Sequence, residues 1–163
     1  MVSWLLLSWM VDKRPSMVGA LTGAVAGLVA ITPAAGYVSP MASIVIGIAA
    51  AVGCFFAMKF RAYMEWDDAL DVWGCHGIGG VIGSILTGVF AAKNIGGFSG
   101  LLEGNTHLFI ANMEGTAISV VFAFVATYVM LSIIKLVMNV KVDVKEEDAS
   151  LDRALHGEEA YAF

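Results

Sequence analysis

The chain has 163 residues, of which 59% are hydrophobic and only 14% are charged. Soluble domains carry about 25% charged residues, so this composition excludes an ordinary soluble protein and is typical of a membrane protein. The formal net charge of −5 comes largely from the last 21 residues. No basic patch suggests that the chain binds nucleic acid.

Residues 1–11 are apolar but too few to cross a bilayer, which takes about 20 residues of helix. A signal peptide is a poor fit, because the stretch has neither a basic start nor a small-residue cleavage site. We expect it to be the last half of a membrane helix whose first half is missing. Charged residues and Pro15 end the run.

Four longer apolar segments follow, each able to span a bilayer as a helix. They are predicted over residues 16–35, 41–58, 69–92 and 106–138. The first two carry small residues four positions apart, namely Gly19, Gly23 and Gly27, then Ala49, Gly53 and Ala57. Such faces allow close packing of membrane helices. The fold class is therefore an all-α integral membrane protein, a polytopic helical bundle, with a membrane domain over residues 1–139 and a tail over 140–163.

Lysine and arginine are concentrated in alternate connections. One set of connections carries Lys13, Arg14, Lys59, Arg61, Lys135 and Lys141, whereas the other carries only Lys93. Positive charge stays on the cytoplasmic side of a membrane. The connections over residues 12–15 and 59–68 and the C-terminal tail are thus predicted to be cytoplasmic, in a multi-pass protein of the plasma (inner) membrane. Its apolar spans are predicted to contact the lipid bilayer.

A single histidine, His76, lies inside the apolar segment over residues 69–92. It is the only His, Lys, Arg, Asp or Glu between Asp71 and Lys93. An ionisable ring inside a membrane span is energetically costly, so it marks a functional site by default.

On an α-helix, small or apolar side chains share a face with this histidine: Val72, His76, Gly80 and Gly83. A neighbouring helix could come close to that face and leave a slot beside the ring. A neutral imidazole offers one donor and one acceptor, which suits a small polar solute or a second imidazole. A structural histidine bonded to a backbone carbonyl is the alternative, and the residues alone leave both open. No metal is predicted, because no His, Cys or carboxylate lies at the helical spacing that a metal site needs.

Asp71 begins the same apolar run, shortly after Asp67 and Asp68. Acidic residues stabilise a helix N-terminus. Asp71 is therefore interpreted either as a structural residue that holds backbone N–H groups or as a residue that handles cations. The chain shows no nucleophile–base pair, so we predict neither an enzyme nor a cofactor.

Three separated stretches resemble the ammonium transporter (Amt) family. They are residues 16–38, SMVGALTGAVAGLVAITPAAGYV, residues 67–91, DDALDVWGCHGIGGVIGSILTGVFA, and residues 151–161, LDRALHGEEAY. The middle stretch contains the pattern D-V-x-G-x-H-G-x-G-G, which in the family carries the second of two pore histidines. The resemblance covers essentially the whole chain.

The resemblance implies a fold of eleven membrane helices in two inverted halves, with three copies forming a homotrimer and one pore in each subunit. The chain would correspond to the end of the seventh helix, the eighth to eleventh helices and the cytoplasmic tail. His76 would be the second pore histidine, Val72 would line the apolar pore, and Thr32 would belong to the T-P region near the pore. The substrate would be ammonium or ammonia, with methylammonium as an analogue.

The resemblance also implies a regulatory tail that contacts the neighbouring subunit, with PII-type signalling proteins docking on the cytoplasmic face. The motif residues are Leu151, Asp152, His156, Gly157, Glu158 and Tyr161. Without the resemblance, residues 140–163 would be interpreted as a solvated acidic tail. Ser150 stands where the family commonly has a glycine, which would permit a turn with positive φ. This difference leaves the geometry of the tail open.

Together these features predict ammonium or ammonia transport across the membrane, with this chain supplying the half-pore that holds the second pore histidine. The first pore histidine, the phenylalanine gate and the outer recruitment site belong to the family's first seven helices. We therefore expect a fragment of a longer protein or a truncated gene product. The alternative function is a truncated, non-transporting membrane scaffold or regulatory subunit of the same fold.

Overall fold

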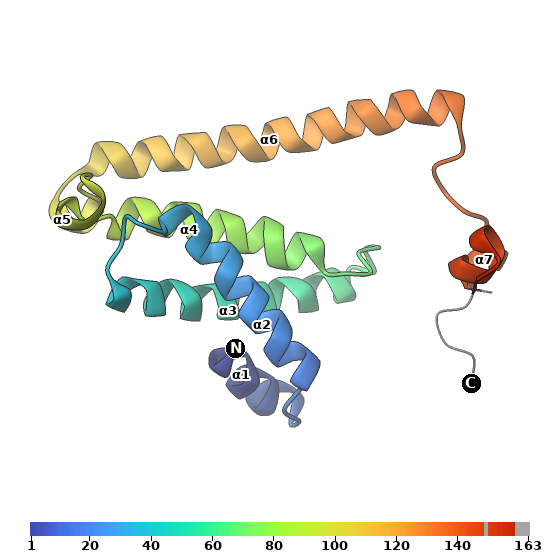
Figure 1. Cartoon of the computed structure of the whole chain (residues 1–163), viewed down its shortest axis with the longest axis horizontal. Helices are drawn as coiled ribbons and strands as arrows, with labels where there is room; N and C mark the ends of the chain where they lie inside the picture. Colours follow the sequence, from blue (N-terminus) through green and yellow to red (C-terminus); the bar gives the residue numbers. More distant parts are fainter. Residues whose placement is uncertain (149, 159–163) are drawn as a thin grey trace. The chain divides into compact units, whose positions relative to one another are not determined.

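The computed structural model describes residues 1–148 and 150–158, and every regular element among them is helical. The α-helices are α1 (Val2–Asp12), α2 (Met17–Ile31), α3 (Pro40–Tyr63), α4 (Gly79–Phe90), α5 (Lys93–Gly96), α6 (Thr106–Val137) and α7 (Val144–Asp148), as Figure 1 shows. Two 3₁₀ turns, η1 (Thr32–Ala34) and η3 (Leu101–Glu103), and two π-helical segments, η2 (Trp73–Ile78) and η4 (Asp152–His156), connect them.

The chain divides into two compact units, Met1–Ile118 and Ser119–Phe163. The division falls within α6, whereas the sequence analysis ends the membrane domain at residue 139. Four stretches are long and apolar enough to cross a membrane: Met17–Ala34, Pro40–Tyr63, Trp73–Phe90 and Thr106–Val137. Each overlaps one of the four segments predicted to span, and an all-α membrane fold is thereby confirmed.

Two span ends differ from their predicted positions by more than two residues. Helix α3 continues to Tyr63, past residue 58, because Arg61 in its last turn is compatible with the negative end of the helix dipole. The fourth span begins near Trp73 instead of residue 69, since Asp71 has a φ of 51° and interrupts helical geometry just before it.

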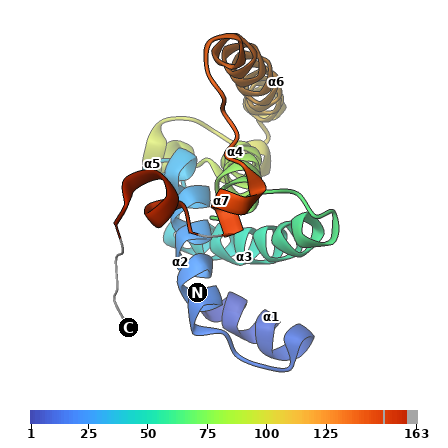
Figure 2. The ribbon, with the colours of Figure 1, turned by 90° about the vertical axis from the view of Figure 1, so that its right-hand side faces the viewer.

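Small residues let the helices of the first unit pack closely. A Cβ added at Gly83 of α4 would overlap the backbone carbonyl of Ala30 in α2, and one added at Gly53 of α3 would overlap Ile82 of α4. The fully enclosed side chains are correspondingly small and are mostly alanines: Ala20, Ala26, Ala30, Ala34, Ala50 and Ala51. Helices α1 and α4 lie on opposite sides of α3 in both views (Figure 1, Figure 2).

The glycines spaced four residues apart in α2, namely Gly19, Gly23 and Gly27, lie on the face that packs in part against Trp4 of α1. Cβ atoms at Gly19 and Gly23 would contact the indole of Trp4 in α1, whereas one at Gly27 would have no atom within 4 Å. Trp4 is 4% exposed, and its ring lies edge-on to that of Phe55 in α3, with 5.4 Å between the ring centroids. Although α1 is too short to span a bilayer, it is an integral part of the packed core.

The connections meet at two separate ends of the first unit. Lys59 pairs with Asp12, which links the end of α3 to the end of α1. At the other end, the rings of Tyr37 and Phe98 lie 6.2 Å apart, and the Ala92 N–H donates to the Tyr37 carbonyl at 2.9 Å. The connections therefore alternate between ends, as the charge-based orientation requires. Which end faces the cytoplasm stays a prediction.

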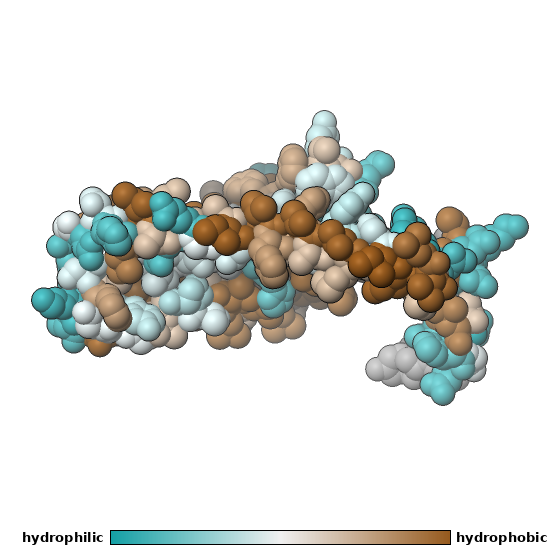
Figure 3. All heavy atoms as spheres, turned by 90° about the horizontal axis from the view of Figure 1, so that it is seen from above, coloured by the Kyte–Doolittle hydropathy of each residue, from teal (hydrophilic) through white to brown (hydrophobic). Residues whose placement is uncertain are grey.

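Helix α6 has no buried residue in this chain. Within the first unit it is held to α4, where the Asn112 side-chain amide donates to the Ser84 carbonyl at 3.4 Å. Its surface is largely hydrophobic along most of its length (Figure 3). An apolar surface of this length is energetically unfavourable in water, whereas lipid and neighbouring membrane helices can cover it.

Candidate functional site around His76

His76 lies in the π-helical segment η2, which leads directly into α4. Single π turns inside α-helices occur frequently at functional sites. Gly74 and Cys75 are buried in the chain, whereas His76 and Gly77 are exposed. The wide turn therefore directs the imidazole away from the side that packs against the rest of the unit.

The packed side of this span is lined by glycine. A Cβ at Gly74 would come within 2.6 Å of the Met58 side chain in α3, and one at Gly79 within 3.3 Å of the Cys54 sulfur. Gly83 makes the tightest of these contacts, against the Ala30 backbone. The two helices α2 and α3 thus hold the span from behind the histidine.

This arrangement corrects the face predicted from α-helical spacing. Gly83 does meet a neighbouring helix closely, but a Cβ at Gly80 would have no atom within 4 Å, and His76 and Val72 are exposed. The π turn takes more residues per turn than an α-helix, so it changes the angle between His76 and the residues of α4, which α-helical spacing leaves out. The histidine and the close helix contact therefore lie on different sides.

Val72, which precedes η2, is 50% exposed and lies one turn before His76. Thr32 begins η1 at the end of α2, and its hydroxyl donates to the Leu28 carbonyl at 2.7 Å. Because Ala30 packs against Gly83, two turns of helix beyond His76, Thr32 lies farther along the span. The structure thus brings Val72 and His76 into one segment but gives no contact between either of them and Thr32.

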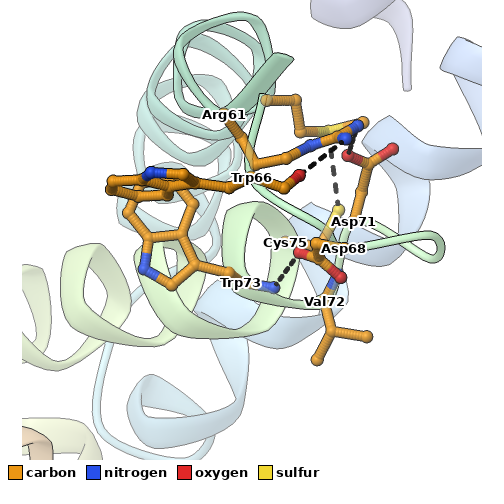
Figure 4. A network of polar contacts seen from close by, with 8 residues as sticks. Arg61, Trp66, Asp68, Asp71, Val72, Trp73 and Cys75 are labelled. Atoms are coloured by element: carbon orange, nitrogen blue, oxygen red, sulfur yellow. Dashed lines mark hydrogen bonds and ion pairs between the residues drawn. The ribbon is translucent and has the colours of Figure 1, made fainter. Parts of the chain in front are cut away.

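Asp68 holds the start of the histidine segment. Its two carboxylate oxygens accept the N–H groups of Val72 at 2.9 Å and of Trp73 at 2.8 Å (Figure 4). One interpretation of the sequence assigned such N–H groups to Asp71, but Asp68 accepts them instead. A capping side chain usually accepts N–H groups two or three residues after it, whereas Asp68 accepts them from four and five residues on, so no sequence rule distinguishes Asp68 from the neighbouring acids.

Asp71 forms an ion pair with Arg61 of α3, whose Nη2 lies 2.8 Å from the Asp71 carboxylate. Arg61 also donates from Nη1 to the Trp66 carbonyl at 3.3 Å (Figure 4). In the sequence, Arg61 is recognisable only as one of the positive charges that orient the chain. Its pairing with Asp71 depends on the path of the intervening loop, which no local pattern reveals.

The tail residues lie in the second unit. Asp152 and His156 bound the π-helical segment η4, and the Glu158 N–H donates to the Asp152 carbonyl at 3.2 Å. Gly157 has a φ of 66°, and Leu151 is 41% exposed. Tyr161 lies outside the described residues.

No group of three His, Cys, Asp or Glu side chains lies close enough to hold a metal ion in the part of the chain that the structure describes. Both cysteines, Cys54 and Cys75, are free and buried. Among the described residues, the site therefore consists of the exposed His76 imidazole, the apolar side chain of Val72, and the ion pair of Arg61 and Asp71 at the start of the segment.

Comparison with known proteins identifies the family. The family model described as "Ammonium Transporter Family" matches residues 1–161. An ammonium transporter of Bacillus subtilis is 44% identical over 161 residues, which are 97% of this chain and 40% of that protein. Ammonium transporter Amt1 of Archaeoglobus fulgidus is 39% identical over 158 residues, again 97% of this chain and 40% of the relative.

The fold points to the same family. The crystal structure of Candida albicans Mep2 superposes with a TM-score of 0.75 at 34% identity, over 80% of this chain and 30% of that one. This chain spans about 40% of the length of the curated relatives. The match over nearly the whole chain, together with the helical fold and four candidate spans, shows that the chain belongs to the ammonium transporter family.

Proposed function

We propose that this chain forms the C-terminal part of an ammonium transporter and supplies half of its pore, with His76 as the second pore histidine. The observation that carries the proposal is the exposed imidazole inside an apolar span. Two helices pack behind its segment, while the face that bears the ring is left open by the described part of this chain. A second half of the protein could complete a pathway on that open face.

The proposed chemistry follows from the cost of moving an ion through hydrocarbon. A bare ammonium ion loses its hydration in an apolar passage, at a large energetic cost. A pore that separates the proton from neutral ammonia avoids this cost. The His76 ring has one donor and one acceptor when neutral, so it can accept a hydrogen bond from ammonia or share one with a second imidazole.

Other residues have supporting roles in the proposal. Val72, exposed one turn from His76, would make the lumen apolar, and Thr32 would lie farther along the pathway. Three copies would form the homotrimer, and the tail would be cytoplasmic and would regulate the pore, with PII-type proteins docking on that side of the plasma membrane. These assignments rest on the family resemblance and on the distribution of lysine and arginine.

Uptake by the full-length protein tests the role of His76. We expect His76→Ala to alter or abolish methylammonium uptake per molecule in the membrane, by roughly tenfold or more, because a positioned hydrogen-bonding group is lost from the pathway. Uptake of labelled methylammonium, normalised to the protein content of the membrane, measures this effect.

His107 provides the matched control, because it is a second exposed histidine at the start of α6. His107→Ala should leave uptake within about twofold of wild type. Unchanged uptake and selectivity in His76→Ala would contradict the pore role. The relatives are named as transporters, which favours transport over a non-transporting scaffold.

A further inference from the structure

One arginine of α3 holds the loop that leads into the segment bearing His76. Arg61 lies in the last turn of α3, and its guanidinium contacts both the middle and the end of the connection that follows. It donates to the Trp66 carbonyl at 3.3 Å and to the Asp71 carboxylate at 2.8 Å (Figure 4). One side chain thus joins two separate points of this connection.

Asp71 passes this constraint directly to the histidine segment. Its carbonyl accepts the N–H of Cys75 at 2.9 Å, which is the residue before His76. Its φ of 51° is a left-handed conformation, which is uncommon for residues other than glycine and persists when surrounding contacts enforce it. The ion pair with Arg61 is such a contact.

The ion pair of Arg61 and Asp71 is partly shielded from water, which strengthens it. The side chains of Arg61 and Asp71 are each only 25% exposed, so water screens them less than it screens a surface pair. The Nε of Arg61 is buried and has no acceptor within the described residues. The guanidinium is therefore held in place by two oxygens of the loop. A lysine could not reproduce both of these directed bonds.

We propose that Arg61 and Asp71 are positioning residues that set the location of the His76 imidazole by fixing the start of its π-helical segment. The role of His76 itself rests on the function proposed above. The pair touches no substrate in this proposal, and it acts only through the backbone between Asp71 and Cys75.

The position of residue 76 can be measured without transport. In the full-length protein, His76→Cys is labelled with methanethiosulfonate ethylammonium, and the parent protein gives the background from its native cysteines, of which Cys54 and Cys75 are buried. We expect Arg61→Met and Asp71→Ala each to change the labelling rate by roughly tenfold, the factor that the loss of a charge-assisted hydrogen bond corresponds to. Asp71→Asn keeps an acceptor and tolerates positive φ, so it should give a smaller change.

Lys59→Met is the matched control. Lys59 lies two residues before Arg61 on the same helix, and its ion pair with Asp12 leads to α1 and away from the histidine. Its labelling rate should stay within about twofold of the His76→Cys parent. A rate that neither Arg61→Met nor Asp71→Ala changes, or that Lys59→Met changes equally, would overturn the proposal. If either truncating variant fails to reach the membrane, Arg61→Lys and Asp71→Asn decide by the same comparison.

Uptake by His76→Ala separates the two claims. If that variant transports normally while the labelling rate responds to Arg61 and Asp71, the proposed function fails and the positioning role stands. If His76→Ala loses uptake but substitution of Arg61 or Asp71 leaves the labelling rate unchanged, the positioning role fails and the proposed function stands.

Discussion

At the scale of single residues, Ser150 shows how a substitution can keep a backbone conformation at an energetic cost. The family resemblance suggests glycine at this position, and the structure gives Ser150 a φ of 82°. The Ala154 N–H donates to its carbonyl at 3.0 Å, so the left-handed residue leads directly into η4. The turn thus keeps the conformation that a glycine adopts without strain.

Ser150→Gly should therefore stabilise the turn before η4. Removal of the Cβ relieves left-handed strain of about 1 kcal/mol, from which the larger chain entropy of glycine in the unfolded state subtracts a part. We expect amide hydrogen exchange over residues 151–157 to slow by about threefold. Ser150→Val should accelerate it. Equal exchange in both variants would contradict a strained turn.

At the scale of elements, sequence patterns predict the spans well but do not predict which face of each span packs against the other helices. The apolar segments and small-residue faces are visible in the sequence, because length and glycine spacing are local properties. The π turn at η2 is not visible in this way. It arises where Asp68, Asp71 and Arg61 hold the start of the span, and these contacts depend on how the loop after α3 folds back.

The contact between α2 and α4 supplies a prediction at this scale. Gly83→Ala should lower the stability of the full-length protein by about 1–3 kcal/mol, because the new methyl group would overlap the Ala30 backbone, which cannot rotate away. Gly80→Ala is the control, since its Cβ would have no atom within 4 Å. The midpoints of thermal unfolding of both variants are measured in detergent, with size-exclusion chromatography to monitor the folded fraction. Equal midpoints for the two variants would show that the helices do not cross closely at Gly83.

At the scale of the whole molecule, family membership and the helical membrane fold were predictable from the sequence, since three separated motifs and the hydropathy pattern agree. The site was predictable only in part. His76 stands out as an ionisable residue in an apolar run, whereas Arg61 looks like any basic residue at a helix end. The proposed half-pore would also need groups from outside this chain, which spans about 40% of the length of its curated relatives.

Flux through purified protein shows whether His76 belongs to an ammonium pathway. The full-length protein and its His76→Ala variant are reconstituted in liposomes at equal density, and ammonium-driven flux is recorded against empty liposomes. We expect flux for the wild type, and for the variant a change of roughly tenfold or more or an altered selectivity against methylammonium. Flux and selectivity that are the same in both proteins would contradict it.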